Sequence, residues 1–243
     1  MNVSCGQAMD PILALRRFGQ SIWLDSIERR LLNSGAFRRL VLEEGLCGVT
    51  SNHTSFAKAI SGSMDYAEAL AALRRKPDLD AKTRYERLAI EDIQTAADLL
   101  QPVYARTKRR DGYVSLEVSP HLARDTSGTL EEAQRLWDAV GRDNLMIKVP
   151  ATPEGIPVMV QLLSKGININ VTLIFSQETY ARVAEAYLLG LEQLAARSGT
   201  VESVASVASV CVSPLDTAAD AAISGYLATS IHEAEWALFR GLR

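Results

Sequence analysis

Lys148 is the residue whose chemistry the rest of the sequence must explain. It lies in the run NLMIKVPAT over residues 144–152, where its neighbours are apolar and a proline closes the apolar stretch. An apolar run of this length predicts a strand of a sheet that is covered on both faces. A lysine there either extends its stem to water or keeps its amine shielded, where it can attack carbonyl groups. The run alone leaves both interpretations open.

Polar residues also stand near the C-terminal ends of the other predicted strands. They are Asp25, Asn52, Glu117, Asn170, Thr172 and Ser209. Each would have to be desolvated and hydrogen-bonded if buried, so core packing explains this pattern poorly. An amine together with carboxylates, carboxamides and hydroxyls suits Schiff-base chemistry on a polyol that carries a carbonyl. The set lacks the histidine of a Ser-His-Asp triad.

The histidines and cysteines do not indicate a metal site. His53, His121 and His232 are far apart, without an i, i+4 pair or a cysteine at ligand spacing. The three cysteines, at positions 5, 47 and 211, form no CxxC pair. A sparse, odd set of this kind is typical of reduced thiols in a cytoplasmic protein. We therefore expect a cytoplasmic protein without a metal ion.

Charge and hydropathy argue against two classes of partner. The net charge of -3 gives no general attraction to nucleic acid or to anionic membranes. No apolar run reaches the roughly 18 residues that a membrane-spanning helix needs, and residues 1–10 do not resemble a secretory signal. The basic segment over residues 106–110 is best interpreted as a solvated helix end, with a phosphate or nucleic-acid site as the alternative. We expect a small-molecule partner.

The elements that must position these residues alternate along the chain. Strands are predicted over residues 21–26, 46–52, 113–119, 145–149, 168–173 and 204–212. Helices are predicted over residues 9–20, 31–44, 64–76, 81–110, 129–141, 154–165, 176–197 and 216–240, with a further helical stretch from residue 56. Such alternation favours a parallel α/β sheet with right-handed crossovers.

The turn after the first strand distinguishes two parallel architectures. A doubly wound nucleotide-binding sheet needs a glycine-rich turn there, whereas residues 25–28 read DSIE. The favoured fold is therefore a single parallel β/α barrel of the TIM-barrel type over residues 1–243. Active sites of such barrels form at the C-terminal ends of the strands, where the polar residues gather.

Five segments, in this order, resemble the transaldolases, and most closely the long bacterial ones. They are IWLD (22–25), GVTSN (48–52), DGYVSLEVSP (111–120), IKVPAT (147–152) and INVTLIFS (169–176). The resemblance runs from about residue 9 to residue 240. It implies a class I aldolase-like barrel, incomplete after about six strand–helix units.

The resemblance implies a catalytic role for four residues. Lys148 would form a Schiff base with a ketose donor. Asp25 would take the proton when the carbon–carbon bond breaks and return it to the aldehyde acceptor. Glu117 would shuttle protons through a water held with Thr172.

The same resemblance implies a binding role for four more. Asn52 and Asn170 would hold the dihydroxyacetone unit, and Ser209 and Thr50 would line the cavity. The substrate would be a sugar or sugar phosphate. No metal or organic cofactor would be needed.

Three positions depart from the family pattern. Pro214 stands where transaldolases place an arginine for the substrate phosphate, and proline has no donor. Cys211 replaces an aromatic residue, and we expect it to pack as an apolar side chain. His53 replaces the proline after Asn52 and is expected to loosen the turn that positions this asparagine.

The resemblance also implies that the family's seventh and eighth strands have no counterpart in this sequence. Six parallel strands would leave two unpaired sheet edges. We expect a homo-oligomer to cover these open barrel edges, with an unusual closure of the barrel or a remnant chain as the alternatives.

Four functions remain open. The first is transfer of a dihydroxyacetone unit from a ketose (phosphate) donor to an aldose, including assembly of an unusual antibiotic sugar such as a lincosamide octose. The second is an aldolase that releases dihydroxyacetone. The third is a catalytically impaired partner or regulatory subunit. A lysine-dependent lyase on keto acids is disfavoured, because no arginine accompanies the strand ends to hold a carboxylate.

Overall fold

Six parallel strands form one sheet in the computed structural model, which describes residues 11–230. Their order in the sheet is their order in the chain: β1 (Trp23–Leu24), β2 (Gly48–Val49), β3 (Tyr113–Glu117), β4 (Leu145–Pro150), β5 (Ile169–Ile174) and β6 (Ser206–Val210). A doubly wound sheet would reverse this order part-way. The sheet is instead a half-barrel of TIM-barrel type, which confirms the predicted fold class.

Helices follow the strands along the chain. They are α1 (Pro11–Leu15), α2 (Arg29–Asn33), α3 (Ala36–Leu42), α4 (His53–Gly62), α5 (Ala67–Arg74), α6 (Ala81–Arg106), α7 (Thr126–Val140), α8 (Gly155–Leu163), α9 (Gln177–Ala196) and α10 (Val212–Ser230). Short 3-10 turns are η1 (Arg16–Phe18), η2 (Met64–Tyr66), η3 (Pro120–Leu122) and η4 (Val201–Ser203).

Residues with left-handed φ values divide one predicted helix and end another. The helix predicted over residues 31–44 is two helices, because Gly35 between α2 and α3 has a φ of 78°. The helix predicted over residues 81–110 stops at Arg106, and Lys108 and Arg109 have φ values of 53° and 67°. Left-handed residues do not continue a right-handed helix.

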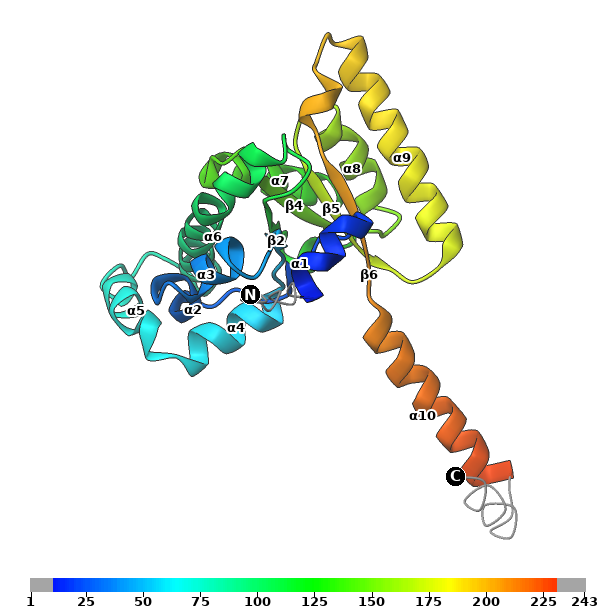
Figure 1. Cartoon of the computed structure of the whole chain (residues 1–243). Coiled ribbons are helices and arrows are strands. Elements are labelled where there is room, and N and C mark those ends of the chain that lie inside the picture. The colour runs from blue at the N-terminus through cyan, green and yellow to red at the C-terminus, as the bar shows by residue number, and fades with distance from the viewer. Residues whose placement is uncertain (1–10, 231–243) are drawn as a thin grey trace, which may run out of the picture.

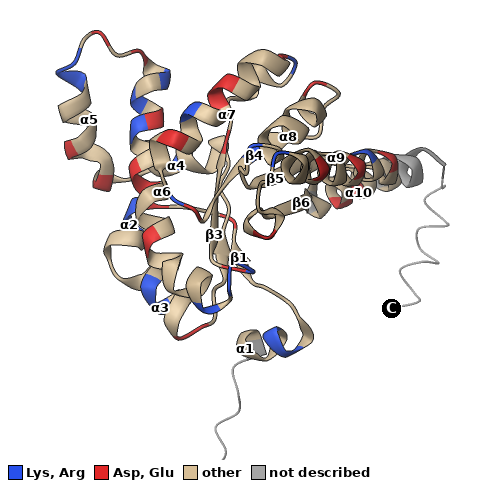
Figure 2. Ribbon diagram, turned by 90° about the horizontal axis from the view of Figure 1, so that it is seen from above, with Lys and Arg blue, Asp and Glu red and all other residues tan. Residues whose placement is uncertain are grey.

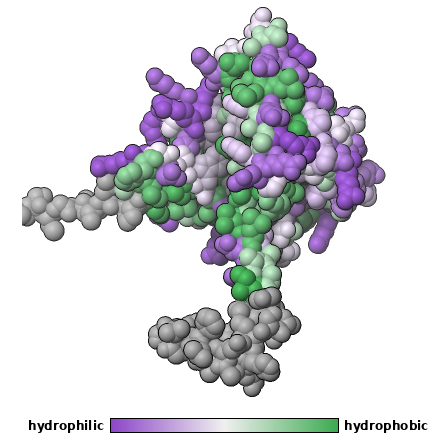
Figure 3. Space-filling view, turned by 90° about the vertical axis from the view of Figure 1, so that its right-hand side faces the viewer, coloured by the Kyte–Doolittle hydropathy of each residue, from purple (hydrophilic) through white to green (hydrophobic). Residues whose placement is uncertain are grey.

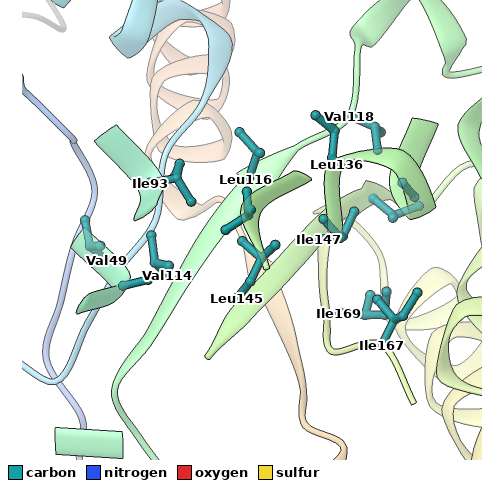
Figure 4. Close-up of a cluster of buried hydrophobic side chains, with 14 of the residues drawn as sticks. Val49, Ile93, Val114, Leu116, Val118, Leu136, Leu145, Ile147, Ile167 and Ile169 are labelled. Carbon is teal, nitrogen blue, oxygen red and sulfur yellow. The ribbon is translucent and has the colours of Figure 1, made fainter. Parts of the chain in front are cut away.

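The hydrophobic core lies between the outer face of the sheet and helices α6 to α9. Alternate strand residues such as Val114, Leu116, Ile147, Val149 and Ile169 are buried there. Figure 4 shows Val114, Leu116, Ile147 and Ile169 among them. Because side chains alternate between the two faces of a strand, the residues between these point to the inner face. Each fully buried aliphatic side chain contributes about 1.5–3 kcal/mol.

Aromatic residues fill the inner face near the start of the strands. Tyr104, Tyr113 and Met146 form a buried cluster, against which Trp23 packs. The Trp23 ring covers Gly48 so closely that a Cβ at this glycine would lie 2.5 Å from it. This cluster closes one end of the half-barrel, so polar residues can face the inside only nearer the C-terminal strand ends.

The β6 side of the sheet is less covered than its middle. Helices α7, α8 and α9 pack back onto strands β4 and β5, whereas α10 starts two residues after β6 and runs away from the sheet (Figure 1). Val210 and Val212 are 52% and 58% exposed. Figure 3 shows hydrophobic side chains gathered on this side of the molecule, toward the start of α10.

Charged residues lie mostly on the helices, and few lie on the strands (Figure 2). Between residues 11 and 230, no helix is both long enough and apolar enough to cross a membrane.

Candidate active site

Lys148 lies in the middle strand of three that pair in register. Glu117 of β3 and Asn170 of β5 pair directly with it. Since Ile147 and Val149 on either side belong to the outer core, the lysine side chain points to the inner face. Residues paired in register share a face, so the three side chains lie in one row across the inside of the half-barrel.

The Lys148 amine is shielded but not neutralised by a carboxylate. The residue is 8% exposed, and Nζ donates a hydrogen bond of 3.2 Å to the backbone oxygen of Ser51. Within residues 11–230 it forms no ion pair. A carboxylate partner would hold the ammonium form, whereas attack on a carbonyl requires the free amine. The structure therefore favours the shielded amine over the surface-directed lysine.

A chain of buried hydrogen bonds holds Asn170 beside this amine. Asn170 Nδ2 donates to Ser115 Oγ over 3.0 Å, and Ser209 Oγ donates to Asn170 Oδ1 over 2.7 Å. Ser51 Oγ adds a bond of 2.9 Å to the backbone oxygen of Ser115. The carboxamide is thus fixed by hydroxyl groups from two other strands. Fixed orientation is what a substrate-binding amide needs.

Ser51 and Ser115 were not among the predicted site residues. Both are buried, at 1% and 0% exposure. The Ser51 backbone oxygen accepts from the Lys148 amine, Ser115 Oγ accepts from Asn170, and the two serines are bonded to each other. The available signal was period-two spacing, because Ser115 is two residues before Glu117 on the same face.

Glu117 lies at the end of β3, where a side cavity opens. It is half-buried and lines a space of about 320 Å³ together with His53, Lys82, Tyr85 and other residues of α6 and α7. Burial first, and then the Glu117 and Glu86 carboxylates, raise the pKa of Tyr85. The Glu117 charge therefore acts on this cavity.

Thr172 is positioned by an irregularity in β5. It pairs with Pro150 and is buried. The next residue, Leu173, has a left-handed φ of 61°, and the pairing of β5 with β6 shifts between Val171 and Ile174. Such bulges re-aim side chains and are frequent next to active sites.

Asn52 and Thr50 follow β2. The Asn52 side-chain oxygen accepts from Ser55 N over 2.9 Å and caps α4. The predicted substrate contact would therefore use the amide nitrogen of Asn52. The Thr50 hydroxyl is buried and, within residues 11–230, has no hydrogen-bond partner.

Asp25 directly follows the edge strand β1. It is exposed, and within the described part of the chain it forms no ion pair. The pairing of Leu24 with Val49 places it beside Thr50. The structure thus brings Glu117, Lys148 and Asn170 into one row, whereas Asp25 lies on the flank of the sheet.

The expectation that His53 loosens the turn after Asn52 is wrong. The ring bonds to the Val118 backbone oxygen over 2.9 Å and to the Tyr85 hydroxyl over 3.1 Å. Asn52 and Ser55 also form a complete capping box on α4. The turn is held by side-chain hydrogen bonds in place of a rigid ring.

The other two departures from the family pattern lie at the β6–α10 junction. Cys211 has a free, half-buried thiol between the two elements. Pro214 stands in the first turn of α10, where a helix does not use its N–H groups. Cys5 and His232 lie outside the described residues. Within those residues, no group of histidine, cysteine or carboxylate side chains could hold a metal ion.

The sequence was compared with known proteins. A sequence model described as transaldolase/fructose-6-phosphate aldolase matches residues 22–236. The chain belongs to this family. A transaldolase of Thiobacillus denitrificans is 49% identical over 209 residues, which are 86% of this chain and 58% of the relative. One from Trichodesmium erythraeum is 44% identical (87% and 56% covered), and transaldolase 2 of a Nostoc species is 40% identical (93% and 59% covered). The chain spans less than two thirds of the length of these relatives.

Proposed function

We propose that this protein is an enzyme that forms a Schiff base between Lys148 and a ketose and transfers a dihydroxyacetone unit to an aldose. The observation that carries the proposal is the buried Lys148 amine, which lies on the inner face in register with Glu117 and Asn170. A shielded amine beside one carboxylate and one fixed carboxamide suits carbonyl chemistry.

The proposed reaction needs one nucleophile and two proton carriers. Lys148 Nζ adds to the ketone carbon, and loss of water gives an iminium ion. The iminium accepts the electron pair of the bond between the α and β carbons as that bond breaks, which leaves an enamine. Asp25 takes the proton of the hydroxyl on the β carbon, which becomes the carbonyl of the released aldehyde. The enamine then attacks an acceptor aldehyde, and Asp25 returns the proton.

The remaining residues assist the formation and hydrolysis of the iminium. Glu117, through a water held with Thr172, moves protons as the carbinolamine gains or loses water. Asn170 and Asn52 hold the hydroxyls of the dihydroxyacetone unit, and Ser209 and Thr50 line the same space. The hydrogen-bond chain from Ser209 through Asn170 to Ser115 supports this assignment.

The identity of the sugars is a separate proposal. Pro214 supplies no donor for a phosphate, and the residues near it offer a half-buried thiol. We infer that the donor or acceptor differs from the usual sugar phosphates, as it would in assembly of an antibiotic sugar such as a lincosamide octose. An aldolase that releases dihydroxyacetone would use the same residues, and the family description covers both activities.

Product analysis tests the proposal. The protein is incubated with fructose 6-phosphate, and with unphosphorylated ketoses, in the presence and absence of aldose acceptors. A new ketose that appears only with an acceptor supports transfer, whereas free dihydroxyacetone without an acceptor indicates an aldolase. No product from any donor contradicts both and favours a partner or regulatory role. The Lys148→Arg variant is the negative control.

We also propose that the protein works as a homo-oligomer. The support is the exposed apolar surface near β6, including Val210, Val212 and Leu215. A second copy would cover this surface and the open sheet edge. The cytoplasmic location remains a prediction from the sparse cysteines.

A further inference from the structure

Two side chains join β2 to β3 beyond the end of their backbone ladder. The ladder itself pairs only Gly48 with Tyr113 and Val49 with Val114. Past it, Ser51 Oγ donates to the Ser115 oxygen over 2.9 Å, and His53 Nε2 lies 2.9 Å from the Val118 oxygen. The contact between these strands at the catalytic end is therefore made by side chains. We call these two bonds the β2–β3 seam.

The partners of His53 indicate which of its ring nitrogens carries a hydrogen. A carbonyl oxygen only accepts, so Nε2 carries the hydrogen that bonds to Val118. Nδ1 can then accept from the Tyr85 hydroxyl, 3.1 Å away. Tyr85 is itself held edge-on against the Phe56 ring, with centroids 6.1 Å apart. The imidazole thus links α4, α6 and the end of β3.

The peptide between Val118 and Ser119 is held on both sides. Its Val118 oxygen accepts from His53, and its Ser119 nitrogen donates to Glu132 Oε1 over 2.5 Å. Glu132 is buried and also binds Lys82. The preceding nitrogen, that of Val118, donates to the Lys148 backbone oxygen over 3.2 Å. The Val118 nitrogen, the Val118 oxygen and the Ser119 nitrogen are therefore all hydrogen-bonded, and His53 supplies one of the three bonds.

We propose that His53 is a positioning residue that fixes the distance between the Ser51–Asn52 segment and Glu117. The Ser51 backbone oxygen accepts a hydrogen bond from the Lys148 amine, and Asn52 is adjacent to His53. The seam therefore sets the spacing between the Lys148 amine, the Asn52 carboxamide and the Glu117 carboxylate. The inference rests on the proposed Schiff-base function. Misplacement of a catalytic group by about 1 Å can cost about 100-fold in rate.

His53→Pro separates positioning from folding. Residue 53 is the first residue of α4, where proline is favoured and no helical N–H is lost. Asn52 has φ -143° and ψ 163°, the extended conformation that a residue before proline adopts. This variant therefore keeps the helix start and loses both ring hydrogen bonds. His53→Gln is the matched control, because its amide can still donate to the Val118 oxygen.

Two measurements on the same three proteins test the inference. The first is amide hydrogen exchange, by mass spectrometry, in peptides that cover residues 113–119. The second is the rate of borohydride-trapped adduct formation on Lys148 with fructose 6-phosphate and with unphosphorylated ketoses as donors. We expect His53→Pro to exchange faster and to form the adduct about tenfold more slowly, and His53→Gln to stay within about twofold of the wild type in both.

The outcomes separate the two proposals. Unchanged exchange in His53→Pro, or an adduct rate equal to that of the wild type, overturns the role of His53. Faster exchange in His53→Pro with no adduct on wild-type Lys148 overturns the proposed function and leaves the seam in place. If His53→Pro and His53→Gln slow adduct formation equally, the inference is also overturned. The hydrogen bond to the Val118 oxygen, which only His53→Gln can keep, would then make no difference to the rate.

Discussion

Polar residues in the middle of the sheet are buried, whereas those on its flanks are more exposed. In β3 to β5, Ser115, Lys148, Asn170 and Thr172 are all at most 8% exposed. On the flanks, Asp25 is exposed after β1, and Ser209 of β6 is half-buried. The polar row is therefore buried where strands lie on both sides and supply hydrogen bonds.

This comparison divides the proposed chemistry between the two regions. The nucleophile and the carboxamide lie in the rigid middle, where each has a bonding partner at a defined distance. The proton carrier Asp25 stands on the flank without an ion pair among residues 11–230. Substitutions in the middle should therefore affect both stability and activity, and those at Asp25 activity alone.

The largest effect is expected at Lys148. Lys148→Met keeps the apolar stem and removes the amine, so turnover should fall by about 1,000-fold or more. The urea midpoint should rise, because burial of a polar amine costs free energy that an apolar methionine side chain does not cost. Lys165→Met, at an exposed position, is the control for the loss of one positive charge. Retained activity in Lys148→Met would remove the basis of the account.

Asp25 should show an effect on activity without one on stability. Asp25→Asn removes the proton carrier, and general acid–base groups contribute about 100- to 10,000-fold. We expect a loss of kcat of about 100-fold with an unchanged urea midpoint. Asp78→Asn, another exposed carboxylate, should change neither. Full activity in Asp25→Asn would show that the flank takes no part in the chemistry.

Substitutions of Asn170 and Ser209 compare the middle of the sheet with its flank, because both residues belong to one hydrogen-bond chain. Asn170→Ala leaves Ser115 and Ser209 without their partner and should lower the free energy of unfolding by about 1–3 kcal/mol, with about a tenfold loss in kcat/KM. Ser209→Ala, at a half-buried position, should cost about 1 kcal/mol or less. Chemical denaturation and steady-state kinetics measure both. Equal effects at the two positions would contradict the proposed gradient from middle to flank.

The smallest effect on catalysis is expected at Val210. Val210→Lys places a charge on the exposed apolar surface near β6 and should shift the protein from oligomer to monomer, with turnover reduced by about twofold at most. Sedimentation velocity gives the mass. Leu42→Lys, on α3 and 56% exposed, should leave the oligomer intact. A wild-type monomer would show that no second copy covers this surface.

The middle of the fold could be predicted from sequence better than the flanks. The alternation of strands and helices, and the order β1 to β6, follow from apolar periodicity, which the core of α6 to α9 enforces. The gathering of Glu117, Lys148 and Asn170 at one end of the sheet was also predicted, because each lies near a strand end. Register, which places them side by side, depends on pairing between strands distant in sequence.

The missed features depend on contacts that local patterns do not contain. Ser51 and Ser115 are short hydroxyl residues inside apolar strands, and only the folded chain shows that they join Lys148 to Asn170. The hydrogen bonds of His53 reach 32 and 65 residues along the chain. The start of α10 at Val212, four residues earlier than predicted, follows from Pro214 fitting the first helical turn.

The most direct test of the central claim is the mass and position of the adduct that borohydride traps when fructose 6-phosphate or an unphosphorylated ketose is the donor. The account predicts a three-carbon adduct on Lys148 alone, because the carbon–carbon bond breaks after the Schiff base forms. Lys148→Met should give none. A six-carbon adduct spread over exposed lysines, or no adduct at all, would contradict the claim that this buried amine is the nucleophile.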